Sequence, residues 1–101
     1  MEPRLTAPAL RALKFLMEKP REARSGAEIA RSARVGSGTL YPLMARFEKA
    51  GWATSEWESI EPAVAGRPRR RLYTLTGLGQ TKAREALQEV HWPQGALAWT
   101  S

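Results

Sequence analysis

Apolar residues recur with helical spacing in the first segment of the chain, and the pattern stops at a proline. The stripe comprises Leu10, Leu13, Leu16 and Met17. This spacing places the side chains on one face of an amphipathic helix. Pro20 cannot continue a helix, so we expect one that runs from Leu5 or Thr6 to about Lys19.

A second, shorter helix is expected after a polar connection at residues 21–24. Ser25 and Glu28 have the spacing of a capping box, in which the serine side chain accepts the backbone N–H of Glu28 and the glutamate reaches back. The apolar residues of this segment are Ile29, Ala30 and Ala33. The pattern predicts a helix from about Gly26 to Arg34, followed by a turn.

The third helical segment has two faces of different chemistry. Its apolar residues keep the i, i+3, i+4, i+7 spacing and are Leu40, Leu43, Met44 and Phe47. Small, polar and basic residues lie on the other side, namely Gly38, Thr39, Tyr41, Pro42, Ala45, Arg46 and Lys49. Ser37 is the predicted N-cap, and Gly51 is the glycine that closes the helix. Such a helix can bury one side in a core while its front end enters a groove.

The next part of the chain has the pattern of a hairpin followed by a final helix. Residues 52–58 alternate as a half-buried strand does, residues 59–69 contain turn formers, and residues 70–75 form the return strand. Thr76 is the predicted cap of a helix from about Gly77 to His91. The fold class is therefore mainly α with a small β-hairpin (α+β), in the order of a winged helix-turn-helix with an added C-terminal helix.

The charge balance indicates an anionic partner without identifying it. The 101 residues carry a formal charge of +6 and a pI near 10.5, which suits DNA, RNA or an anionic membrane surface. No apolar run approaches the ~18 residues of a membrane span, and the N-terminus lacks the apolar region of a signal peptide. The absence of cysteine fits a cytoplasmic protein.

The residue types present give little support to catalysis. The chain has one histidine, His91, and neither Asp nor Cys, which excludes the usual nucleophilic triads and most zinc sites. Gly77-Leu78-Gly79 opens like a dinucleotide fingerprint, but position 82 is a lysine. We therefore expect no enzyme activity, no cofactor and no metal.

A cluster of arginines follows Gly66 at the end of the predicted hairpin tip. Its members are Arg67, Arg69, Arg70 and Arg71. Most charge runs are only solvated surface, but a cluster without an acid among its members favours a wing that binds phosphate groups. Alternation along a strand predicts that Arg69 and Arg71 share one face and that Arg70 takes the other.

The front of the third helix supplies candidates for direct contact with duplex DNA. Ser37, Gly38 and Thr39 would let the backbone approach bases closely while the helix N–H groups face phosphate. Tyr41 can donate to a phosphate, or it can pack into the core or the wing. Pro42 can contact DNA, or it can simply tighten the first turn.

Basic and helix-start residues complete the expected interface. Arg46 and Lys49 lie farther back on the third helix and suit phosphates better than base edges. Ser25 and Gly26 are expected to contact the DNA backbone from the start of the second helix. We expect residues 1–76 to form the DNA-binding domain and residues 77–101 to form a dimerisation segment.

Two stretches of the sequence carry a family resemblance. The first is Gly38-Thr39-Leu40-Tyr41-Pro42-Leu43 with Arg46-Phe47-Glu48-Lys49-Ala50-Gly51, and the second runs from Gly66 to Thr76 and leads to Gly79. Over about residues 5–90 the chain resembles the PadR family of bacterial winged-helix transcription regulators. The resemblance implies a homodimer whose third helix lies in the major groove and whose wing touches the backbone or the minor groove. It also implies dimerisation through the C-terminal helix, at Leu78, Ala83, Leu87, Val90 and Trp92.

The chain departs from the family pattern in two places. Gly77-Leu78 stands where members often have Pro-Glu, so the start of the last helix lacks its acidic residue. The sequence ends at residue 101, which predicts a short form without the extended C-terminal helical domain of some members.

Tryptophans raise the question of an effector. Trp52 and Trp57 are expected to fill the core between the sheet and the helices. Trp92 is expected near the dimer seam, where some family members hold flat aromatic compounds. A small aromatic effector is therefore a hypothesis, and dimer packing is the favoured alternative. Leu97 and Trp99 in the tail could bind a partner or form a swapped segment.

These observations predict a sequence-specific DNA-binding transcription regulator. We expect a homodimeric repressor that binds a near-palindromic operator through the third helix and the arginine-rich wing. The alternatives are a protein–protein adaptor and a sequence-indifferent architectural DNA-binding protein with the same fold.

Overall fold

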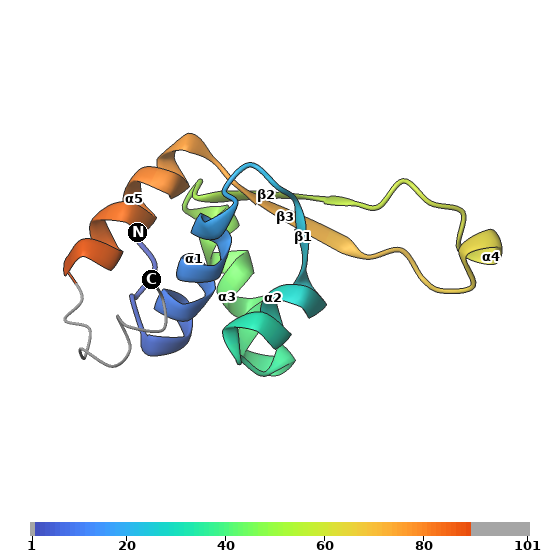
Figure 1. The fold of residues 1–101 in the computed structure, drawn as a ribbon, viewed down its shortest axis with the longest axis horizontal. Coiled ribbons are helices and arrows are strands. Elements are labelled where there is room, and N and C mark those ends of the chain that lie inside the picture. Colours follow the sequence, from blue (N-terminus) through green and yellow to red (C-terminus); the bar gives the residue numbers. More distant parts are fainter. Residues whose placement is uncertain (1, 90–101) are drawn as a thin grey trace.

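A helical body and a long two-limbed wing make up the protein, as Figure 1 shows for the computed structural model, which describes residues 2–89. The elements in chain order are α1 (Ala7–Glu18), β1 (Arg24–Ser25), α2 (Gly26–Ala33), α3 (Ser37–Lys49), β2 (Ala53–Trp57), α4 (Pro62–Ala65), β3 (Arg71–Leu75) and α5 (Gly77–Glu89). The predicted fold class, a mainly helical winged helix-turn-helix, is confirmed. Among the described helices, none has the length and apolar character needed to cross a membrane.

Local hydrogen bonds fix the ends of the first helices. The Thr6 side chain accepts the N–H of Ala9 at 3.3 Å, so Thr6 is the N-cap of α1 rather than its first residue. Ser25 accepts the N–H of Glu28 at 3.1 Å, as the capping-box spacing predicted. Glu28 does not complete the box, because its carboxylate accepts from Arg24 Nη1 at 2.7 Å instead.

The N-terminal end of α3 differs from the prediction, and its C-terminal end agrees with it. Gly36, not Ser37, is the N-cap of α3, and no side chain caps this end. Ser37 is already the first helical residue, so its hydroxyl is not used as a cap. At the far end Gly51 has φ +80, and the Trp52 N–H reaches back to the Phe47 carbonyl at 2.8 Å. Gly51 therefore closes the helix as expected.

The sheet has a third strand that the sequence pattern did not predict. Its order is β1-β3-β2 and both pairings are antiparallel. In β1, Arg24 pairs with Tyr73 and Ser25 with Leu72. This corrects the expected polar connection at residues 21–24. A strand of two residues is too short to show an alternation of buried and exposed side chains. Its partner strand, β3, lies far along the chain, so no local pattern predicts the pairing.

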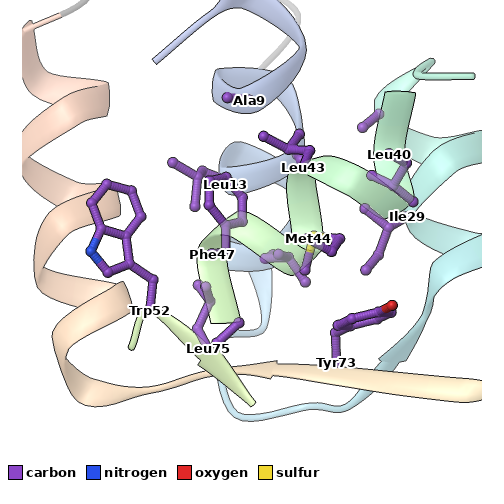
Figure 2. Packing of buried hydrophobic residues seen from close by; sticks show 14 of the residues in the cluster. Ala9, Leu13, Ile29, Leu40, Leu43, Met44, Phe47, Trp52, Tyr73 and Leu75 are labelled. Carbon is purple, nitrogen blue, oxygen red and sulfur yellow. The ribbon is translucent and has the colours of Figure 1, made fainter. Parts of the chain in front are cut away.

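The hydrophobic core gathers the inner faces of α1, α2, α3 and the sheet, as Figure 2 shows. The apolar stripe of α3 lies at its centre, with each of its four side chains at most 1% exposed. Trp52 stacks on Phe47 with ring centroids 5.6 Å apart, which confirms its place in the core. Trp57 contradicts the prediction, because 60% of it is exposed. It is the last residue of β2, where the sheet leaves the helical body.

The start of α5 is anchored to the end of α3. Thr76 Oγ1 accepts the N–H of Gly79 at 2.9 Å and donates to the Gly51 carbonyl at 2.6 Å, which confirms Thr76 as a cap. The Trp52 carbonyl accepts the Thr76 N–H at 3.0 Å. Gly79 passes so close that a Cβ atom there would lie 1.8 Å from the Trp52 oxygen. A side chain of any size is therefore excluded at position 79.

The interface expected on α5 is only partly available. Ala83 is fully buried and belongs to the same core as α1, so it cannot face a partner and its assignment is corrected. Leu78 is 49% exposed, and Leu87 is partly buried. Val90 and Trp92 lie outside the described residues, as do His91 and the Leu97–Trp99 tail. The dimer seam and the aromatic effector therefore stay predictions.

The close approach at Gly79 makes a testable prediction about stability. Gly79→Ala should lower the free energy of unfolding by at least about 3 kcal/mol, because backbone atoms would have to move apart. Gly77→Ala, two residues earlier, is the matched control, since an added Cβ there meets nothing within 4 Å. Its effect should stay within about 0.5 kcal/mol. Urea denaturation of both variants measures the difference, and equal stabilities would contradict the packing described here.

Candidate nucleic-acid interface

The polar face of α3 is exposed along its whole length. The residues predicted to contact DNA are Ser37, Gly38, Thr39, Tyr41, Pro42, Arg46 and Lys49, and every one of them is exposed. The buried stripe on the opposite side fixes this orientation, since rotating the helix would expose its apolar side chains. The helix thus offers small residues at its front and basic residues toward its end.

Tyr41 connects α3 with the start of α2. It is 42% exposed, and a Cβ added to Gly26 would lie 2.4 Å from Tyr41 Cε1. The ring edge therefore lies against the Gly26 backbone, a position that the sequence pattern did not predict. A larger residue at position 26 would force the ring to move. The remaining surface of the ring stays open for an external contact.

The start of α2 plays a structural part rather than the expected contact with a DNA backbone. Ser25 is 9% exposed and its hydroxyl already accepts the Glu28 N–H. Gly26 is buried beneath Tyr41. These two residues therefore support the interface from inside, which revises their predicted role.

One wing arginine is neutralised within the wing. Arg67 donates to the Glu58 carboxylate through Nη1 at 2.6 Å and through Nη2 at 3.1 Å. The backbone N–H of Arg70 donates to the same carboxylate at 2.9 Å. The hydrogen bond from Arg67 is the main reason why the pKa of Glu58 falls to about 2, and the Arg70 N–H adds to the effect. Arg67 thus joins the two limbs of the wing.

A second arginine connects the wing with α3. Arg71 Nε donates to the Ser55 hydroxyl at 2.9 Å, and its guanidinium lies 5.1 Å from the centroid of the Trp57 ring. The Ser55 hydroxyl in turn donates to the carboxylate of Glu48 on α3. A polar chain from Glu48 through Ser55 to Arg71 therefore fixes the base of the wing against α3.

Arg69 and Arg70 are the exposed members of the arginine cluster. Arg69 Nε donates to the Ile60 carbonyl at 3.0 Å, and the residue remains exposed, as does Arg70. The strand β3 begins only at Arg71, so the alternation expected for residues 69–71 does not apply to the first two. Arg67 and Arg71 thus bind other side chains of the wing, Arg69 is exposed but bonded to a backbone carbonyl, and Arg70 is exposed.

Three residues of this region were missed in the sequence. Glu48 stands in the first family stretch without an assigned role, Ser55 and Glu58 carry no motif, and each of the three resembles an ordinary surface residue. The hairpin register gives a usable signal for Glu58, because its N–H donates to the Arg70 carbonyl at 2.9 Å across the wing. An acid placed opposite an arginine cluster should be expected to pair with it.

The fold and this surface define the class of the protein. A three-stranded sheet, a helix with an exposed polar face and a cationic wing form a winged helix-turn-helix of the DNA-binding type. The model of the PadR-like transcriptional regulator family matches residues 21–85. The chain belongs to this family, and it is therefore a DNA-binding transcription regulator and not an enzyme.

Solved structures show the same fold. A PadR family regulator from Clostridium difficile R20291 is 24% identical with a TM-score of 0.67, and the alignment covers 83% of this chain and 86% of that one. A PadR family regulator from Eggerthella lenta is 27% identical with a TM-score of 0.61, over 76% and 69% of the two chains. MepR, a regulator of the Staphylococcus aureus efflux pump MepA, is 16% identical with a TM-score of 0.64, over 82% and 56%. No curated protein matches the sequence.

The pairing of Glu58 with Arg67 predicts a measurable titration. The Glu58 carboxyl should titrate near pH 2, against an ordinary value of 4.5. Because the folded state has the lower pKa, the pair stabilises the protein fully above pH 4.5, and this contribution is lost as the pH falls toward 2. In Arg67→Met the midpoint should return toward 4.5. NMR titration of the carboxyl carbon checks this, and identical midpoints in both proteins would contradict the pairing.

Proposed function

We propose that the protein is a homodimeric repressor that reads a near-palindromic operator through the front of α3, assisted by Arg69 and Arg70 of the wing. The observation that carries this proposal is the exposure of all the predicted contact residues of α3 while the opposite stripe is buried in the core. A helix held in this way is a rigid probe for the major groove.

The proposed contacts follow from position along α3. Gly38 and Thr39 lie in the first turn, where the absence of large side chains lets the helix end approach base edges. Arg46 and Lys49 lie two to three turns later and bind phosphates. Tyr41, supported by Gly26, contributes its open ring surface to the sugar–phosphate wall. Base reading and phosphate binding are thus separated along one helix.

A dimer would place two such helices on one face of the duplex. Twofold symmetry with a separation of about 34 Å, one turn of B-DNA, allows both helices to enter successive major grooves. The exposed Leu78 on α5 supplies an apolar contact for this dimer, together with residues beyond 89. Repression then follows from occupancy of promoter DNA.

The division of the wing arginines predicts a difference in salt dependence. If Arg69 and Arg70 each neutralise one phosphate per protomer, replacing both with Ala removes four contacts from the dimer. The slope of log K against log salt should then become shallower by about 3 to 4, at roughly 0.9 per phosphate. Titration of a labelled operator duplex at several salt concentrations measures this slope.

The matched control removes the same charge elsewhere. Lys19 and Arg21 are exposed on the connection after α1, so Lys19→Ala with Arg21→Ala should change the slope by less than about 1. An equal change in both double variants would show that the wing acts only through net charge. Unaltered binding in the wing variant would contradict its part in the interface.

Sequence specificity needs a test of its own. Selection of bound fragments from random duplexes should give a motif with dyad symmetry. In the Thr39→Ala variant, the preference at particular positions of each half-site should weaken by about 1–3 kcal/mol while binding elsewhere is unchanged. A selection that yields no motif would favour a sequence-indifferent architectural protein.

A further inference from the structure

The turn between α2 and α3 contains a backbone conformation that costs energy. Arg34, the C-cap of α2, has φ 58 and ψ 49, and it is the one non-glycine residue with positive φ in the part of the chain that the structure describes. The left-handed region crowds the Cβ atom, so a residue other than glycine stays there only when neighbouring groups hold it. We therefore looked for the contacts that fix this turn.

Backbone hydrogen bonds satisfy only part of the turn. The Val35 N–H donates to the Ala30 carbonyl at 2.9 Å, and the Arg34 N–H donates to the Arg31 carbonyl at 3.4 Å. The last carbonyls of a helix have no partner within the helix itself. Those of Ala33 and Arg34 accept no N–H from the described backbone. These two carbonyls need donors from elsewhere.

Arg11 of α1 supplies the missing donors. Its Nε donates to the Ala33 carbonyl at 3.0 Å, and its Nη2 donates to the Arg34 carbonyl at 3.4 Å. A guanidinium presents its donors in a rigid plane, so one side chain can hold two successive carbonyls. The end of α2 also carries a partial negative charge, which favours a cation at this position.

No acid competes for this guanidinium among the described residues. Glu18 is the one acid that lines the groove beside Arg11, and it does not come within ion-pair distance of it. The ion pairs of the described chain all involve other cations. The charge of Arg11 is therefore directed at the end of α2.

The turn that Arg11 holds leads directly to the end of α3 proposed for base reading. Gly36 is the N-cap of α3, and no side chain caps this end. The Gly36 carbonyl accepts the Thr39 N–H at 3.0 Å and the Leu40 N–H at 2.8 Å, which forms the first turn of the helix. A helix end without a capping side chain depends on the preceding turn for its position. The other anchor of this turn is Val35, which is buried in the core.

We propose that Arg11 is a positioning residue for operator reading, which holds the α2–α3 turn and thereby the start of α3. This inference rests on the proposed reading of bases by Gly38 and Thr39. Arg11 acts through the two carbonyls and need not touch DNA. Its loss should displace the reading end, while the phosphate contacts farther along α3 and in the wing remain. Binding to the operator should therefore suffer more than binding to a random duplex.

Operator and random duplexes, measured with the same variant, separate positioning from charge. Arg11→Met keeps most of the side-chain length and removes the donors. Operator affinity should fall by roughly 10-fold, about the effect of one lost base contact, and random-duplex affinity should fall only as much as in Arg21→Met. Arg21→Met is the matched control, because Arg21 is exposed on the connection after α1. An equal loss on both duplexes would overturn the proposal, since a direct phosphate contact or partial unfolding would produce it.

A conservative variant tests the contact with two carbonyls. Arg11→Lys keeps the positive charge but lacks the planar pair of donors, so its operator preference should lie between those of the wild type and Arg11→Met. Full wild-type preference in Arg11→Lys would overturn the two-carbonyl contact. A wild-type protein without any sequence preference would refute the proposed function, and the role of Arg11 with it. Equal preference in the wild type and Arg11→Met would refute the role of Arg11 alone.

Amide hydrogen exchange supplies a readout that needs no DNA. In Arg11→Met the protection of the Thr39 and Leu40 N–H groups should fall by roughly 10-fold, the effect of losing a hydrogen bond from a charged group. The Trp52 N–H, bonded at the far end of α3, should keep its protection. Unchanged protection at both ends would overturn the proposal, because burial of Val35 would then suffice. An equal loss at both ends would also overturn it, since it would show general destabilisation.

Discussion

The apolar stripe of α3 is the constraint on which the remaining structure depends. Leu40, Leu43, Met44 and Phe47 lie at the centre of the core, and burial of four such side chains contributes on the order of 6–12 kcal/mol. Because this face is inside, the opposite face must be outside. The helix at the centre of the core therefore also carries the exposed polar face that we propose for DNA contact, and loosening its packing would displace that face.

The number of arginines in the wing sequence differs from the number that the folded wing leaves exposed. Four arginines stand in a run of five residues, yet Arg67 is bound by Glu58, and Arg71 by Ser55 and the Trp57 ring. Arg67 joins the two limbs of the wing and Arg71 ties its base to Ser55, whereas Arg69 and Arg70 stay exposed. Arg67 and Arg71 thus order the wing, and the wing in turn exposes Arg69 and Arg70.

Local chemistry explains which features could be predicted. The helices, the Thr76 cap and the closing Gly51 follow from periodicity and from backbone preferences within a few residues. The predictions failed where distant partners decide the outcome. The strand β1 exists because β3 offers it an edge, Trp57 is exposed because β2 runs beyond the helical body, and Ala83 is buried because α5 packs against α1.

The sequence by itself determined the class of fold, the face of α3 that is exposed and the family. Each of these depends on patterns of residues within short stretches of the chain, which can be recognised without the folded structure. The tertiary structure alone decided which arginines bind other side chains of the wing, that Tyr41 lies on Gly26, and that the wing ends in an apolar turn. These depend on pairings between residues that meet only after folding, where a single hydrogen bond across the hairpin changes what a side chain can do.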